Sequence, residues 1–432
     1  MFFRLYLSDQ RIIFCRITVF GRVQYEPVAL LCDMKILLVL ADFNRKKWNS
    51  SSEQAWNIAR RLTGDKHIQC VIASVRGEGE PALEEVSGVP IRRFTPAISR
   101  WSIFLGRQRQ CLSSGNFQLP GLDIYLSKNA FDLVHIVGAN KVAVQAASAA
   151  RRKGVPYVLT LRRRDLSGAD AAGKTVWDFE KHFKEYQDML KNAALIFCGD
   201  RALRRALASA LGDRKLVGWL NGVAREFFFT PGNVEFRQVF QLPQSMPLLL
   251  TVGEVAERRK QKMLLEVLSV LKKRKLNCIL VVIGWAACDE IMDDFRKAVR
   301  RCELESSVLI IPGLPPGDER FRAAFHAASL VLLPAMDDVS SSAVLEAWAA
   351  GVPVVASPVG GGGMIADNVN GRVAEPGKFA DWVKCCEDLL SERNRSANEK
   401  IRSAGRAEAM KLVWEKRIDE LVEIYRINGI LK

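Results

Sequence analysis

The stretch LPAMDDVSSSAVLEAWAAGVPVVASPVGGGG, residues 333–363, holds the end of an apolar strand, an acidic and serine-rich loop, a helix, a second apolar strand and four glycines. Two continuously apolar strands joined by a helix indicate a parallel βαβ unit that is buried on both faces. We expect the helix to begin near Ser342. Its first N–H groups lack intrahelical partners and carry partial positive charge, so this helix start is suited to holding a diphosphate.

The same alternation of apolar strands and helical segments extends from this stretch along the chain. A turn-rich segment, FFFTPGNVEF (227–236), separates two such series and is expected to link two domains. We predict an α/β chain of two Rossmann-like, doubly wound parallel-sheet domains that face a central cleft. The expected strands are 35–40, 70–75, 131–138, 156–161 and 194–199 in the first series, and 247–253, 278–284, 307–313, 329–335 and 352–358 in the second.

The ends of the chain differ from the two series. Residues 1–33 contain apolar patches that arginine or aspartate interrupts, so they do not indicate a secretory signal. We interpret them as an N-terminal extension outside a working protein that begins at Met34, with a peripheral membrane anchor as the alternative. The first domain is then expected over 34–230, the second over 231–410, and an amphipathic helix over 411–432.

The amino-acid composition limits the classes of binding partner that we expect for this chain. A formal charge of +15 favours anionic partners such as phosphorylated substrates, although a basic surface also serves solubility alone. No zinc-finger spacing or RNA-recognition signature is present, so we expect no nucleic-acid partner. No apolar run reaches the roughly 18 residues that a membrane-spanning helix requires. The 10 cysteines show no C-x-x-C spacing, and no metal site is expected.

Two acids flank the predicted helix start, Asp338 on the loop and Glu346 on the helix. Carboxylates accept hydrogen bonds from neighbouring hydroxyl groups, often two at once, so they suit a ribose and a hexose better than a phosphate. A capped surface helix with two solvated acids is the competing interpretation.

Residues 333–363 resemble the signature of glycosyltransferase family 4, the group 1 glycosyltransferases, which have the GT-B fold. In that family two glutamates eight positions apart precede an A-M-A-x-G-x-P-V-V-A run and a Gly-Gly turn. Glu346 matches the second glutamate, and Asp338 takes the place of the first. The resemblance implies that Glu346 holds the ribose hydroxyls and that Asp338 is a catalytic contact to the donor sugar. The helix start would supply donor-binding residues Ser340, Ser341 and Ser342.

A second match lies in TVGEVAERRKQKMLLEVL (251–268), which resembles the family segment V-G-R-L-x-x-x-K-G. There an arginine and a lysine neutralise the donor diphosphate. In this chain Glu254 replaces the arginine, which reverses the charge, and Arg259 occupies the lysine position. A guanidinium group pairs with phosphate in a bidentate manner. The donor-binding residues expected here are Gly253, Arg258, Arg259 and Lys260, with a solvated basic loop as the competing interpretation.

Three further segments of the chain resemble segments of the family, and they occur along the chain in the same order as in the family. LNGVAREFFFTPG (220–232) resembles the domain junction, with Ala224 in place of an aspartate. FDLVHIVG (131–138) fits a family strand in which His135 is expected to be structural. LVWEKRIDELVEIY (412–425) resembles the terminal helix that packs back across the first domain.

The first domain is expected to bind the acceptor. TLRRRDLSG (160–168) resembles a loop near the reacting sugar, which makes Arg162 the second predicted catalytic residue. The family's Gly-Gly loop after the first strand is replaced by DFNRKKWNSSSEQ (42–54). Ser50 and Glu53 there have the spacing of a capping box. This basic loop is expected to favour an anionic acceptor, or to be merely solvated; its predicted acceptor-binding residues are Arg45, Lys46, Lys47, Ser51 and Ser52.

These features predict a retaining, metal-independent hexosyltransferase that uses a nucleoside-diphosphate sugar as donor substrate and needs no cofactor. Its acceptor would be a glycan or a lipid-linked molecule in glycan, lipopolysaccharide or glycolipid biosynthesis. A cytoplasmic location is expected, with peripheral contact at the inner face of a membrane left open.

Two alternatives to an active transferase remain. One is a degenerate GT-B protein that binds a sugar nucleotide or glycan without turnover, which Glu254, Asp338 and Ala224 motivate. The other is a different enzyme with paired Rossmann-like domains, such as a nucleotide-sugar epimerase. A dinucleotide-dependent enzyme is disfavoured because no G-x-G-x-x-G follows the first strand of either series.

Overall fold

The computed structural model describes most of the chain. Within residues 1–33 it describes backbone only, where strands β1 (Leu5–Leu7), β2 (Ile13–Val19) and β3 (Arg22–Val28) pair as an antiparallel sheet. The start of the working protein at Met34 stays a prediction. The described residues are 5–7, 13–19, 22–28, 34–44, 49–98, 117–162, 165, 183–199, 201–212, 215–219, 221–232, 234–286, 288–315, 317–336 and 342–431.

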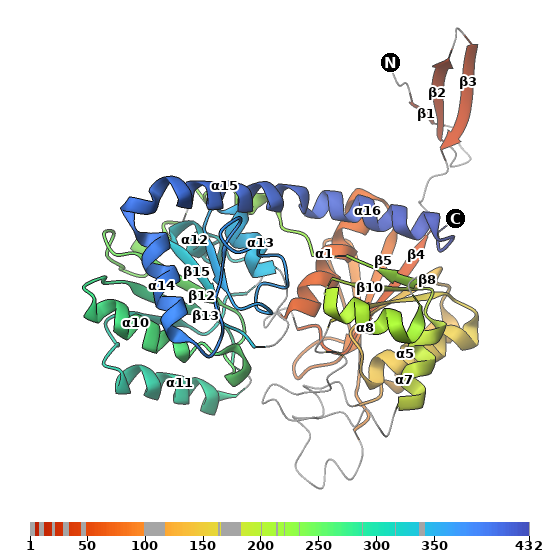
Figure 1. Cartoon of the computed structure of the whole chain (residues 1–432). Coiled ribbons are helices and arrows are strands. Elements are labelled where there is room, and N and C mark those ends of the chain that lie inside the picture. The colour runs from red at the N-terminus through yellow and green to blue at the C-terminus, as the bar shows by residue number, and fades with distance from the viewer. Residues whose placement is uncertain are drawn as a thin grey trace.

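The first domain is built on an eight-stranded sheet (Figure 1). Its strands are β4 (Lys35–Leu40), β5 (Gln69–Val75), β6 (Leu83–Val86), β7 (Val89–Phe94), β8 (Leu133–Val137), β9 (Tyr157–Leu161), β10 (Leu195–Cys198) and β11 (Leu216–Val217). Their order is β11-β10-β9-β8-β4-β5-β7-β6, and every pair is parallel except the β6–β7 hairpin at one edge. Its helices are α1 (Ser50–Asp65), α4 (Pro120–Lys128), α5 (Lys141–Lys153), α7 (Phe183–Asn192) and α8 (Arg201–Leu211).

Alternate residues of β4 divide between two hydrophobic cores, one on each face of this sheet. Leu37 and Val39 pack with α4, α5, α7 and α8. Ile36 and Leu38 pack with α1 and with the C-terminal residues 414–431. Because both faces are covered, the strand is apolar throughout, as the sequence of a doubly wound sheet requires.

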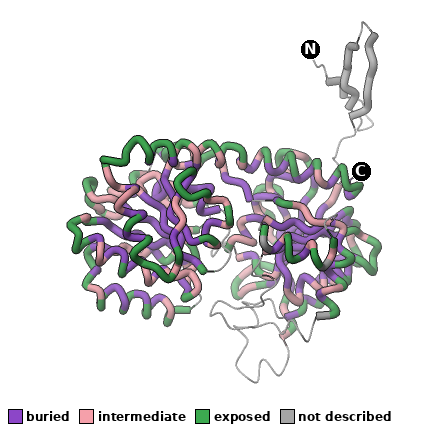
Figure 2. The backbone as a smooth tube through the Cα atoms, in the orientation of Figure 1, coloured by how far each residue is buried: buried purple, intermediate pink, exposed green. Residues whose placement is uncertain are grey.

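The second domain repeats this architecture. Its strands are β12 (Leu248–Val252), β13 (Ile279–Ile283), β14 (Val308–Ile311), β15 (Leu330–Leu333), β16 (Val354–Ala356) and β17 (Arg372–Val373). Their parallel order, β14-β13-β12-β15-β16-β17, is that of a dinucleotide-binding fold. The helices are α9 (Phe236–Val239), α10 (Met263–Lys273), α11 (Asp289–Arg301), α12 (Glu319–Ala327), α13 (Ser342–Ala349), α14 (Phe379–Leu390) and α15 (Arg395–Lys411). Figure 2 shows buried backbone segments inside both domains, and the two parallel sheets confirm the predicted fold class.

The chain passes between the domains at two points that lie side by side. The Val223 N–H donates to the Leu412 carbonyl at 2.9 Å, and the Trp414 N–H donates to the Val223 carbonyl at 3.0 Å. A Cβ atom on Gly222 would lie 2.7 Å from the Trp414 ring, so only glycine fits this position without a shift. The two crossings therefore form one paired connection.

The segment predicted to link the domains packs on the second domain. The ring of Phe227 lies 5.7 Å from that of Phe325 on α12, and Phe236 is buried in the same core. The segment expected to link the domains, 227–236, thus buries aromatic residues against the second domain, and the paired crossing lies earlier, around Val223.

Helix α16 (Trp414–Ile427) packs on the sheet of the first domain, as Figure 1 shows. Its Tyr425 hydroxyl lies 2.7 Å from Nδ1 of His135, whose Nε2 lies 2.7 Å from the Thr160 hydroxyl. Burial lowers the pKa of His135 to about 3, so the ring is neutral. His135 therefore fixes the returning helix to the sheet, in accord with the structural role that the sequence suggested.

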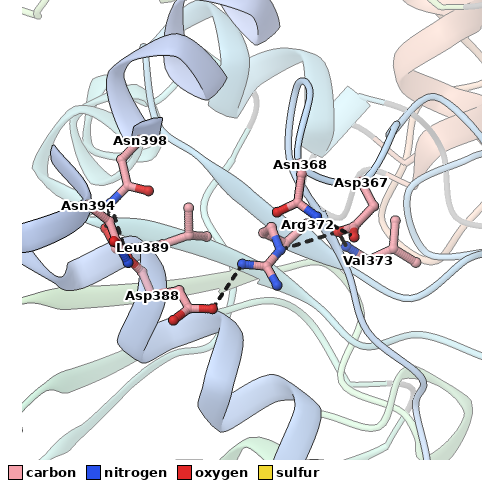
Figure 3. Close-up of polar contacts among 8 residues, drawn as sticks. All are labelled: Asp367, Asn368, Arg372, Val373, Asp388, Leu389, Asn394 and Asn398. Carbon is pink, nitrogen blue, oxygen red and sulfur yellow. Dashed lines mark hydrogen bonds and ion pairs between the residues drawn. The ribbon is translucent and has the colours of Figure 1, made fainter. Parts of the chain in front are cut away.

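An ion-pair network closes the far edge of the second domain (Figure 3). Arg372 on β17 lies 3.3 Å from the Asp367 carboxylate and 3.2 Å from that of Asp388 on α14. The side-chain amide of Asn398 donates to the carbonyls of Asp388 and Leu389, at 3.1 and 2.9 Å. These bonds satisfy the last carbonyls of α14, which have no partners within the helix, and attach α15 to it.

Candidate active site

Helix α13 begins next to the place where the strand order of the second sheet reverses, between β12 and β15. Ligands of open parallel sheets bind beyond the carboxyl ends of strands at such a reversal. All eight residues of α13 are buried, including Ser342 at its start. Asp338, Ser340 and Ser341 lie outside the described residues, so their roles stay predictions.

The glycine run folds against the end of β15. The Gly360 N–H donates to the Ser357 hydroxyl at 2.7 Å, and that hydroxyl donates to the Ala335 carbonyl. A Cβ on Gly360 would lie 2.5 Å from the Leu333 carbonyl oxygen. The close approach explains a glycine at this position, and it holds the loop beside the strand that leads to α13.

Two acids, one from each domain, approach each other beside Ser342. Glu346 lies one turn after Ser342 and is 9% exposed. Glu53, in the first turn of α1, accepts a hydrogen bond from the Ser342 side chain. Burial raises the pKa of Glu53 to about 7 against the opposing effects of Ser342 and Arg162. Burial, and then the charge of Glu53, raise the pKa of Glu346 well above its usual range.

The capping box that the sequence suggested for Ser50 and Glu53 is not formed. Asn49 caps α1 instead, and its side-chain oxygen accepts from the N–H groups of Ser51 and Ser52, both at 2.9 Å. Asparagine is as good a cap as serine, and it stands one position earlier. The Glu53 carboxyl group is therefore directed to the second domain.

Arg162 joins this group from the end of β9. Its guanidinium donates to the hydroxyls of Ser50 and Ser51, and its backbone N–H donates to the Asp165 carboxylate at 2.8 Å. Its charge also acts on Glu53. Two residues chosen for different roles, Arg162 for catalysis and Ser51 for the acceptor, thus lie together at the first turn of α1.

Ser52 does not share this position. It is fully buried, and its hydroxyl lies 3.1 Å from both the Asp42 carbonyl and the Asn49 side chain. Its hydroxyl is hydrogen-bonded inside the loop, and its role in acceptor binding stays a prediction. Arg45, Lys46 and Lys47 lie outside the described residues.

Sequence reasoning missed two residues of this group, Glu53 and Asn221. The Asn221 amide, at the crossing between the domains, donates to the Ser342 hydroxyl at 3.3 Å. The Ser342 side chain therefore accepts from Asn221 and donates to Glu53. The Asn-Gly pair in the junction segment was the only local signal for Asn221, and Glu53 was assigned to helix capping.

The loop after β12 carries the predicted phosphate-binding residues. Gly253 has a φ of 116°, and a 3₁₀ turn spans Glu257–Arg259. Arg258 forms an ion pair with Glu254, and Lys260 lies 3.0 Å from Glu257. Arg259 is half-buried in the same turn. The acid that replaces the family arginine is thus neutralised by the arginine one turn later.

The Met336 N–H donates to the Arg258 carbonyl at 2.9 Å, which attaches this loop to the chain leading into α13. The two parts of the predicted donor site are therefore neighbours. Over the part of the chain that the structure describes, no group of three or more His, Cys, Asp or Glu side chains could hold a metal ion. Within the same residues, no helix has the length and apolar character to cross a bilayer.

Curated relatives are glycosyltransferases. The chain is 28% identical to the D-inositol 3-phosphate glycosyltransferase of Segniliparus rotundus over 46% of its own length and 44% of the relative. It is 25% identical to the enzyme of that name from Nocardiopsis dassonvillei over 85% of this chain and 87% of the relative. The match to the Segniliparus protein thus spans less than half of that relative's length.

Solved structures agree on the fold. Anabaena Alr3699/HepE in complex with UDP and glucose superposes with a TM-score of 0.71 at 16% identity, over 91% of this chain and 99% of that one. Two family models match in succession: the glycosyl transferase 4-like domain over 51–217 and the glycosyl transferases group 1 model over 233–408. This chain belongs to glycosyltransferase family 4, the group 1 glycosyltransferases, and has the GT-B fold.

Proposed function

We propose that this chain is a retaining hexosyltransferase that uses a nucleoside-diphosphate sugar as donor without a metal ion. The observation that carries the proposal is the meeting of Ser342 and Glu346 from the second domain with Arg162 and Glu53 from the first. A donor held by the second domain would there face an acceptor held by the first.

In this proposal the donor diphosphate lies at the start of α13 and next to Arg259. The helix N–H groups and a guanidinium supply fixed positive charge where the leaving group develops negative charge. Glu346 accepts hydrogen bonds from the ribose hydroxyls. The structure of Anabaena Alr3699/HepE with UDP and glucose, which has the same fold, supports a donor of this class.

Catalysis would then rest on positioning and on stabilising the leaving group. The bond between the anomeric carbon and the diphosphate breaks as the acceptor oxygen bonds to that carbon on the same face, and the proton of the acceptor hydroxyl passes to the departing diphosphate oxygen. Attack on the same face retains the anomeric configuration. Arg162 stands on the acceptor side of the site and Asp338 contacts the donor sugar. Contact between the domains excludes water and so limits donor hydrolysis.

We also propose a phosphorylated or otherwise anionic acceptor. The basic loop residues Arg45, Lys46 and Lys47 follow the first strand of the acceptor domain. The two relatives quoted above are named for D-inositol 3-phosphate, which carries such a group. Assays should therefore include phosphorylated polyols alongside glycan and lipid-linked acceptors.

One of the three observations that favour the degenerate, non-catalytic alternative is weakened by the structure. Glu254 reverses the charge of the family motif, but Arg258 forms an ion pair with it, and two further cations, Arg259 and Lys260, follow in the same loop. Asp338 and Ala224 remain departures from the family pattern.

A panel of nucleotide sugars tests the proposal. A donor that binds the folded protein raises its melting temperature, and slow hydrolysis of that donor alone reveals turnover. We expect one nucleotide sugar to do both. Binding without hydrolysis or transfer to any acceptor class would favour the degenerate alternative, and no binding at all would overturn the proposed donor site.

A further inference from the structure

Glu53 connects the two domains at the start of α13, where the donor diphosphate is proposed to lie. It belongs to α1 of the acceptor domain, yet its carboxyl group accepts a hydrogen bond from Ser342, the first residue of α13 in the donor domain. Ser342 is 6% exposed and also accepts from Asn221 at the crossing. A residue of one domain thus holds the helix start of the other.

The charges around Glu53 make its contact with Ser342 depend on the protonation of the acids there. Among the described residues, the charged groups that act on it are Glu346 on α13 and Arg162 at the end of β9, and Asp165 lies 3.8 Å from the Arg162 guanidinium. One guanidinium, itself shared with Asp165, cannot offset the charges of both the half-buried Glu53 carboxylate and the buried Glu346 carboxylate. Two like charges in a poorly solvated contact repel strongly, so such a pair retains one proton.

We propose that Glu53 is a positioning residue for the transfer reaction, which sets the start of α13 through Ser342 and shares one proton with Glu346 when the domains meet. This proposal rests on the proposed function, because α13 is the helix that we propose to hold the donor diphosphate. Separation of the domains would break this contact, so domain closure would take up a proton.

The direction of the pH dependence follows from this linkage. With the domains apart, Glu53 is in water and has its ordinary pKa of 4.5, whereas in the contact its pKa is about 7. The closed form binds the extra proton, so closure is most favoured at low pH. The ratio of closed to open molecules should fall by up to about tenfold per pH unit between these two values and then level off.

The first test needs no ligand. Small-angle X-ray scattering on the full chain measures the radius of gyration from pH 5 to pH 8. We expect the radius of the wild type to rise with pH, Glu53→Gln to lose at least half of that rise, and Glu53→Gln/Glu346→Gln to lose all of it. Glu266→Gln, which neutralises an exposed acid on α10, should follow the wild type. A wild type without the rise, or a Glu53→Gln profile like that of the wild type, overturns the proposal.

The second test separates positioning from mere folding. Glu53→Gln keeps an oxygen that accepts from Ser342, so it should keep kcat at low pH and extend kcat/KM to higher pH. Glu53→Ala removes that acceptor and should lower kcat/KM about tenfold at every pH, with thermal melting confirming that both variants fold. Equal profiles for the two variants would refute the role. If no variant or wild type turns over any donor, the proposed function fails, while the scattering result still decides the contact.

Discussion

Replacing Glu346 by glutamine should make the protein more stable and less active. The side chain is 9% exposed, and burial together with the charge of Glu53 raises its pKa well above the usual range. Glutamine has the same shape but no charge to desolvate. A carboxylate retained at such a cost is better explained by ligand binding than by folding.

The expected changes in stability and in nucleotide affinity can be estimated from the surroundings of Glu346. Exchanging a buried, poorly paired charge for a neutral group of similar volume gains about 1–3 kcal/mol, which corresponds to roughly 2–12 °C in melting temperature for a domain of this size. Hydrogen bonds to charged groups contribute about 1.5–3 kcal/mol, so weakening one ribose contact should cost about 10- to 150-fold in nucleotide affinity.

The sign of the pH dependence provides a further check. A raised pKa means that the folded wild type binds the proton more tightly than the unfolded chain. Its stability is therefore fully present below 4.5, the ordinary value for glutamate, and declines as pH rises through the raised pKa. The stabilising effect of Glu346→Gln should be small at pH 5 and grow toward pH 8.

Thermal melting at pH 5 and pH 8, with calorimetric titration of UDP and GDP, measures both effects. Glu266→Gln, on the exposed face of α10, is the matched control and should change neither. A melting temperature that falls in Glu346→Gln, or a nucleotide affinity equal to that of the wild type, would refute the reasoning.

Three further outcomes are expected. Arg259→Ala should lower kcat/KM about 10²-fold in a steady-state transfer assay without lowering the melting temperature, because it removes a phosphate contact and no core packing; unchanged kinetics would remove Arg259 from the site. Gly222→Ala should cost about 1–3 kcal/mol in chemical denaturation, because its methyl group would overlap the Trp414 ring, whereas Gly64→Ala, which meets nothing within 4 Å, should not destabilise. Tyr425→Phe should cost about 1 kcal/mol in the same measurement, because Nδ1 of buried His135 loses its partner; a smaller loss would show that water replaces the hydroxyl.

Buried strands were the part of the fold that the sequence predicted best. KILLVL was expected over 35–40, and β4 has those bounds. The β6–β7 hairpin was missed because β6 is largely exposed and Pro90 in β7 argues against a regular strand. Its signal was the Ser87–Gly88 pair, whose φ values of 50° and 75° are those of a two-residue hairpin loop.

The site was predictable only in part, for a physical reason. Motif resemblance selected Ser51, Arg162 and Glu346, and the structure brings their segments together. Glu53 has a spacing that fits a local cap equally well, and nothing in a linear pattern distinguishes a side chain that bonds its own helix from one that crosses to another domain. Such a contact depends on how two folded domains meet.

The Glu254 charge reversal illustrates how a departure from a family pattern should be weighed. Position by position, an acid where relatives carry an arginine argues against phosphate binding. The 3₁₀ turn places Arg258 against Glu254, so the cation has moved four residues along the chain while its charge stays in the loop. Its carbonyl also accepts from Met336, which ties that turn to the approach to α13. The electrostatic function of the loop therefore depends on the sum of its charges near α13, and by that measure Arg259 leaves the loop able to hold an anion.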